Sequence, residues 1–257
     1  MQSSNPVLTR LGEAARASRY ETGYPGAQAP SRAMTMDDVV VRTVALLAVT
    51  GVFGAGAWTL LPNTPGVMVL AVIGSLIAGL VLGLVISIMR ITNPVVIMIY
   101  AAAQGIVLGV ISRAYESWYS GIILQAVIGT FGVFAVMAVL YKLKVLRATP
   151  RFTKFVLGAL IGVVVLSLAN WLFYLFGVNL GLRDYGTTGS VGWLPIVFSL
   201  IVIGVGALTF ILDFDQIEQG VRYGLPQKYS WYCAFGILVG LIFLYYEILR
   251  LLSYLRR

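Results

Sequence analysis

An acidic cluster ends a long apolar run in the stretch "LTFILDFDQIEQG" at residues 208–220. Asp213 and Asp215 are two residues apart and Glu218 follows, after apolar sequence that begins near residue 191. A carboxylate is costly in hydrocarbon, and one retained there commonly marks an ion pathway or a proton relay. Carboxylate oxygens are also the ligands that Ca²⁺ takes. The stretch predicts either an ion site, with Asp213 and Asp215 as candidate calcium ligands, or the solvated end of a membrane helix.

The helix period divides these acids between two faces. At about 100° per residue, Asp213 is turned about 160° from Asp215. Glu218 and Arg222 have the favourable i, i+4 order, and Asp215 lies one turn before Glu218. We therefore expect Asp215, Glu218 and Arg222 to form a solvated cytoplasmic end that includes Gln216. Asp213 is the acid expected to face the bundle interior, as the gating carboxylate.

Glu247 is a second ionisable residue in apolar sequence. It lies about 16 residues into the last apolar segment, or roughly 24 Å along a helix axis, which is far in depth from Asp213. An i, i+3 ion pair with Arg250, or protonation of the carboxylate, would offset the cost of burying Glu247 without any functional role. A gating or ion-binding role is the other interpretation, and the sequence leaves both open.

The composition indicates that most of the chain lies in a lipid bilayer. The 257 residues are 59% hydrophobic and only 11% charged, which is more apolar surface than a soluble domain of this size could bury. The chain has no histidine and one cysteine, Cys233, which excludes disulfide pairs, histidine zinc sites and imidazole catalysis. We expect no enzyme activity and no cofactor apart from calcium. An intramembrane aspartyl protease would need two facing carboxylates, and a GxGD motif is missing.

Seven apolar stretches are long enough, at about 20 residues, to cross a bilayer as helices. The prediction is an all-α integral membrane protein in which residues 1–37 form a disordered cytoplasmic tail and residues 38–257 form a seven-helix transmembrane domain. Turn signals such as "LPNTPG" and "ITNP" separate the stretches. The predicted spans are 39–61, 66–89, 94–111 (the shortest), 121–141, 155–176, 191–212 and 231–252.

The positive residues predict the orientation. The net charge of +8 is dispersed between the apolar runs, as for topology determinants, and is not gathered into a nucleic-acid-binding patch. Most Lys and Arg residues fall inside if the N-terminus is cytoplasmic. We expect a multi-pass protein of the plasma membrane with its N-terminus in the cytoplasm.

Four of the segments carry two glycines four residues apart, at 79 and 83, 105 and 109, 158 and 162, and 236 and 240. This spacing makes a flat strip on one helix face, which lets another helix backbone approach closely. The strips predict either tight packing within one bundle or weak self-association.

The order of these features resembles the Bax inhibitor-1 family, which includes the bacterial YccA-like proteins. The residues that carry the resemblance are "DFDQIEQG" at the exit of the sixth span, "YSWYCAFG" entering the seventh and the closing "EILRLLSYLRR". The leading "SSNPVLTR" is similar to the actinobacterial branch of the family. The resemblance implies a two-layer bundle around a central last helix.

The resemblance also implies a function, namely a pH-sensitive calcium leak gated by two aspartates, one ending helix six and one within helix seven. Gln216 matches the glutamine of the first motif, so Asp213 or Asp215 takes the place of the first aspartate. The second position falls at Val239 or Gly240, neither of which can titrate. The alternative function is a non-transporting scaffold that regulates a membrane protease or a stress response.

Overall fold

The computed structural model describes residues 32–257 except 63, 179 and 184–190. All helices of the described chain belong to one compact unit, Ala33–Arg257. The predicted tail lies almost wholly in residues 1–31, outside the described residues. Seven α-helices are present in the described chain: α2 (Met36–Leu60), α3 (Pro65–Met89), α4 (Pro94–Trp118), α5 (Ile122–Lys142), α6 (Pro150–Leu175), α7 (Trp193–Arg222) and α8 (Tyr229–Leu255).

The helix starts follow from local sequence chemistry. Thr35 accepts a hydrogen bond from the Asp38 backbone while the Asp38 carboxylate accepts one from the Thr35 backbone, so a capping box begins α2. Helices α3, α4 and α6 begin with proline, whose missing N–H costs nothing in the first turn. The Asn93 side chain caps α4 by accepting from Val95 N–H at 2.9 Å. The predicted turns at "LPNTPG" and "ITNP" are therefore confirmed as helix boundaries.

Six of the helices are long and apolar enough to cross a membrane, which confirms an all-α multi-pass membrane protein. In α3 the apolar stretch found among the described residues is shorter, Ile73–Met89. The span predicted as the shortest, 94–111, is a 25-residue helix that continues to Trp118. It continues because its polar residues find partners, with Ser112 bonded to Tyr245 and Arg113 bonded to the Leu61 carbonyl.

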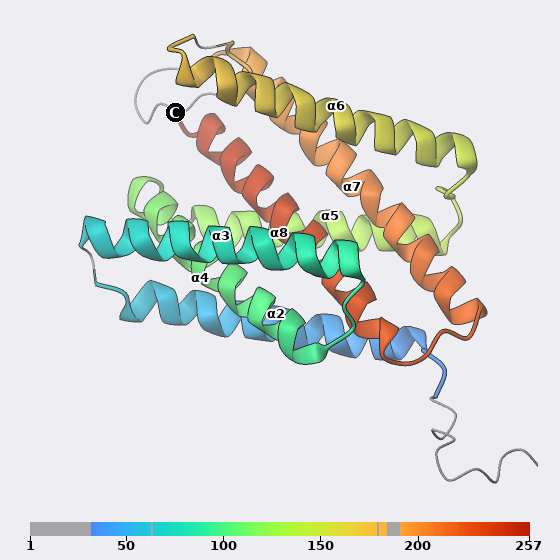
Figure 1. Cartoon of the computed structure of the whole chain (residues 1–257). Helices are drawn as coiled ribbons and strands as arrows, with labels where there is room; N and C mark the ends of the chain where they lie inside the picture. Colours follow the sequence, from blue (N-terminus) through green and yellow to red (C-terminus); the bar gives the residue numbers. More distant parts are fainter. Residues whose placement is uncertain (1–31, 63, 179, 184–190) are drawn as a thin grey trace, which may run out of the picture. The chain divides into compact units, whose positions relative to one another are not determined.

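Helix α8 packs against α2, α4, α5 and α7, whereas α3 packs on α4 and α6 on α7. Figure 1 shows α8 in red passing among its neighbours, with α6 beside α7. Half of the most apolar part of α8 is buried, a larger share than in most of the other spans. The prediction of a central last helix is confirmed.

Glycine allows the closest helix contact, between α2 and α4. A Cβ atom on Gly109 would lie 2.2 Å from the Gly54 carbonyl oxygen, and one on Gly105 would lie 2.4 Å from that of Thr50. These are backbone atoms that cannot swing aside, so the strip at 105 and 109 packs within the bundle as predicted. On α6, a Cβ atom added at position 158 or 162 would meet no described atom within 4 Å.

Candidate functional site

Asp213 lies in the interface between α7 and α8. It follows the buried residues Ile211 and Leu212 and is itself half-buried. Among the described residues, its carboxylate has no hydrogen-bond or ion-pair partner. Cys233 of α8 is close enough to interact electrostatically with it. The predicted interior acid is thus set against the central helix without a countercharge.

The packing register of α7 on α8 shows what lies at the depth of Asp213. A Cβ atom on Gly206 would contact the Phe243 ring at 2.8 Å, and one on Gly240 would contact the Phe210 ring at the same distance. The two helices are antiparallel, so residue numbers rise along α7 where they fall along α8. Asp213, one turn after Phe210, therefore lies at about the depth of Gly236 on α8. The non-titrating Gly240 therefore packs against Phe210, one turn away from Asp213.

Asp215 and Glu218 occupy the other, polar face of the α7 end. Asp215 accepts a hydrogen bond from Gln219 at 2.6 Å, and Glu218 pairs with Arg222 at 2.5 Å, which confirms the predicted i, i+4 contact. Tyr141 of α5 also donates a short hydrogen bond to Glu218. Gln216 is exposed. A polar pocket of about 410 Å³ is lined by Asp215, Glu218, Gln219, Arg222 and Tyr223.

Glu247 is buried, with 4% of its surface exposed, and two arginines bind the same carboxylate oxygen. Arg250 donates to Oε1 at 2.8 Å, which confirms the predicted i, i+3 pair. Arg183, in the connection between α6 and α7, donates to Oε1 at 3.1 Å. Its other nitrogen bonds Ser167 of α6 at 3.2 Å, and its guanidinium lies 5.5 Å from the centre of the Phe198 ring of α7.

This buried cluster, Arg183, Glu247 and Arg250, joins the α6–α7 connection to α8 at one end of the bundle. Two cations beside one carboxylate offset the cost of removing its charge from water. Glu247 Oε2 and Arg183 Nε are buried and accept or donate no hydrogen bond among the described residues. The cluster therefore fixes the α6–α7 connection to the last helix and leaves one acceptor and one donor unused.

The structure does not bring Glu247 to Asp213. Cys233, the α8 residue that interacts with Asp213, lies 14 positions before Glu247, or about 21 Å along the helix axis. The acids thus form separate sites, as their predicted depths indicated. Arg183 as a partner of Glu247 and Tyr141 as a partner of Glu218 were not predicted from the sequence. No periodic signal links residues so far apart in the chain.

In the described part of the chain, His, Cys, Asp and Glu residues form no group of three or more that could hold a metal ion. Asp213 and Asp215 also point to different faces. The geometry is thus that of single carboxylates along a helix end.

The fold and these sites define a multi-pass helical membrane protein with ionisable groups held between its spans. The family model described as "Bax inhibitor 1 like" matches residues 5–257, and the chain belongs to that family. A comparison with curated proteins found no match.

Proposed function

We propose that this protein is a pH-sensitive cation leak of the bacterial plasma membrane, with calcium as the permeant ion and the N-terminus in the cytoplasm. The observation that carries the proposal is the Asp213 carboxylate, half-buried between α7 and the central helix with no countercharge in the described chain. An ionisable group at such a place is a candidate for an ion path. Oxygen ligands from a carboxylate and from backbone carbonyls suit Ca²⁺.

Gating follows from the charge of Asp213. When protonated, the side chain is neutral and allows α7 to pack against the apolar face of α8. When ionised, it places an uncompensated negative charge in that interface, which favours entry of water and a cation and separates the two helices. Cys233 of α8 is a titratable group close enough to interact electrostatically with it. Flux should therefore increase as the pH rises.

Asp215 and Glu218 gather cations at the mouth of this path. Both belong to the polar pocket at the end of α7, where a negative surface raises the local concentration of cations. Arg222 offsets part of that charge. Removing the charge of Asp215 or Glu218 should therefore lower the rate of calcium flux at low calcium and leave the response of the flux to pH unchanged.

The test is a flux assay with purified protein in liposomes that contain a calcium dye, at about pH 6 and pH 8. The proposal predicts calcium entry above that of empty liposomes, larger at pH 8. Asp213→Asn should make the flux independent of pH, and Asp215→Asn is the matched control on the opposite face. Absence of entry above empty liposomes at both pH values would rule out the leak.

The second candidate is a scaffold that regulates a membrane protease or another membrane protein in a stress response. Its support is the α6 face at Gly158 and Gly162, which meets no described atom within 4 Å and could seat a partner helix. Copurification of a membrane protein with the wild type, lost with Gly158→Leu, would favour this function. If the Gly158→Leu variant retains the same partner, this face of α6 is not the surface that binds it.

A further inference from the structure

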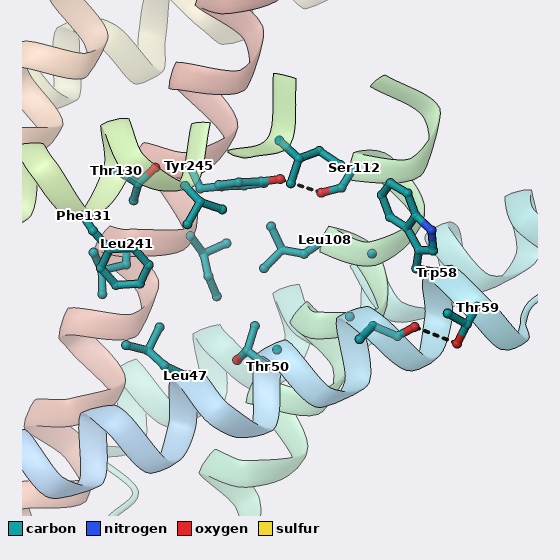
Figure 2. Close-up of a pocket in the computed structure, with 17 residues that line it drawn as sticks. Leu47, Thr50, Trp58, Thr59, Leu108, Ser112, Thr130, Phe131, Leu241 and Tyr245 are labelled. Atoms are coloured by element: carbon teal, nitrogen blue, oxygen red, sulfur yellow. Dashed lines mark hydrogen bonds between the residues drawn. The ribbon is translucent and has the colours of Figure 1, made fainter. Parts of the chain in front are cut away.

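A cavity of about 490 Å³ lies between α2, α4, α5 and α8, away from the acidic residues. One face of α2 forms its floor from Leu47 to Thr59, and Tyr245 and Leu241 of the central helix form part of its wall. Figure 2 shows these side chains around an open space, with Trp58 at one end and Phe131 and Leu241 toward the other.

Four of the five side-chain hydroxyls that line the cavity already donate a hydrogen bond. Ser112 and Tyr245 share a hydrogen bond of 2.6 Å, which Figure 2 marks with a dashed line. The threonine hydroxyls donate to carbonyls of their own helices, at 2.9 Å for Thr50, 2.9 Å for Thr59 and 2.7 Å for Thr130. Few side-chain hydroxyl donors are therefore left for a polar ligand, and because most of the lining residues are apolar the cavity suits an apolar one.

The mouth of the cavity is continuous with the surface that faces lipid. The α2 residues Gly51, Ala55 and Thr59 lie one turn apart, line the cavity and are exposed, as is Phe131 of α5 with 46% of its surface. In a helix that crosses the membrane, such exposure is exposure to lipid. An acyl chain can enter sideways without leaving hydrocarbon.

The length of the cavity matches one leaflet. From Leu47 to Thr59 the helix rises about 18 Å, whereas half of the hydrocarbon core is about 15 Å thick. The cavity reaches the end of α2, where Trp58 is placed as interfacial tryptophans are. Arg113 binds the Leu61 carbonyl at 3.0 Å at the same end, which sets a cation where a lipid phosphate would lie.

We propose that this cavity binds one acyl chain of a membrane phospholipid, with the anionic phosphate toward Arg113. The site is independent of the proposed leak. Its contact with Tyr245 and Leu241 means that the bound chain packs directly against the central helix.

The test is native mass spectrometry of the purified protein in mild detergent with added dipalmitoyl phosphatidylglycerol. Wild type should bind one lipid saturably, and dioctanoyl phosphatidylglycerol should bind more weakly because its chains fill less of the cavity. Gly51→Leu should weaken binding roughly tenfold or more, since a Cβ there meets open space in the cavity and the new side chain occupies it. Ala55→Leu is a second filling variant.

Gly56→Leu is the matched control, because Gly56 lies on the same helix with open space around it but does not line the cavity. It should bind lipid as the wild type does. Equal binding by Gly51→Leu, Ala55→Leu and Gly56→Leu would overturn the proposal, as would no saturable binding by the wild type. A protein dimer lost in Gly51→Leu, with no bound lipid, would assign the cavity to a second copy instead.

A measurement in membranes covers the case in which the filling variants fold poorly. In a protein with Trp58 as its single tryptophan, lipids brominated on the acyl chain should quench its fluorescence at a low mole fraction of brominated lipid. Quenching that rises only in proportion to the bulk lipid composition would overturn the site.

Discussion

Arg183, in the connection between α6 and α7, donates a hydrogen bond to the buried carboxylate of Glu247 in α8 at 3.1 Å. Glu247 receives a second bond from Arg250, so one oxygen binds two guanidiniums. The Asp213 carboxylate interacts electrostatically with Cys233, which lies about 21 Å from Glu247 along α8, and has no such partner among the described residues. Glu247 is therefore compensated and suited to holding helices together, whereas Asp213 is uncompensated among the described residues and suited to switching.

Arg183→Met should destabilise the protein strongly. Removing one partner leaves Glu247 buried with only Arg250, and breaking a buried pair costs about 3 kcal/mol. Thermal unfolding in detergent measures the loss. Adding Glu247→Met should restore most of the stability, because the buried carboxylate that lost one of its two partners is then gone. Arg222→Met is the control, because that pair is exposed and contributes less than about 1 kcal/mol. Equal losses for Arg183→Met and Arg222→Met would contradict a structural role for the cluster.

Gly109→Ala should force α2 and α4 apart. The added methyl group would lie 2.2 Å from a backbone oxygen that cannot rotate away, and overpacking of this kind costs about 1–3 kcal/mol or more. The same change at Gly158, whose Cβ position meets open space, should leave the unfolding temperature almost unchanged. If both variants unfold like the wild type, the close approach of α2 and α4 is incorrect.

Asp213→Cys should crosslink to the native Cys233. The two side chains are close enough to interact electrostatically, and Cys233 is the only cysteine of the chain, so no other thiol competes. A short bifunctional thiol reagent followed by mass spectrometry of proteolytic fragments detects the bridge. Asp215→Cys, on the opposite face of α7, should remain unbridged. Crosslinking at the second position but not the first would reverse the assignment of the two faces.

The features that could be predicted from the sequence are those that depend on residues close together in the chain. Apolar length located the spans, and helix periodicity paired Glu218 with Arg222 and Glu247 with Arg250. It also separated Asp213 from the polar face that holds Asp215. Each of these follows from geometry within one helix.

Contacts between distant segments could not be predicted in this way. Arg183 and Glu247 are 64 residues apart, and Tyr141 and Glu218 are 77 apart. The glycine strip at 105 and 109 indicated close packing, yet nothing in it identified α2 as the partner. The predicted span 94–111 is shorter than α4, which continues to Trp118 with Ser112 and Arg113 bonded to neighbouring elements.

The central claim is that the charge on Asp213 opens a cation path, and its most direct test is the pH dependence of calcium flux in liposomes. The account predicts that wild type and Asp215→Asn admit more calcium at about pH 8 than at pH 6, while Asp213→Asn shows equal flux at both. An unchanged pH response in Asp213→Asn would contradict it.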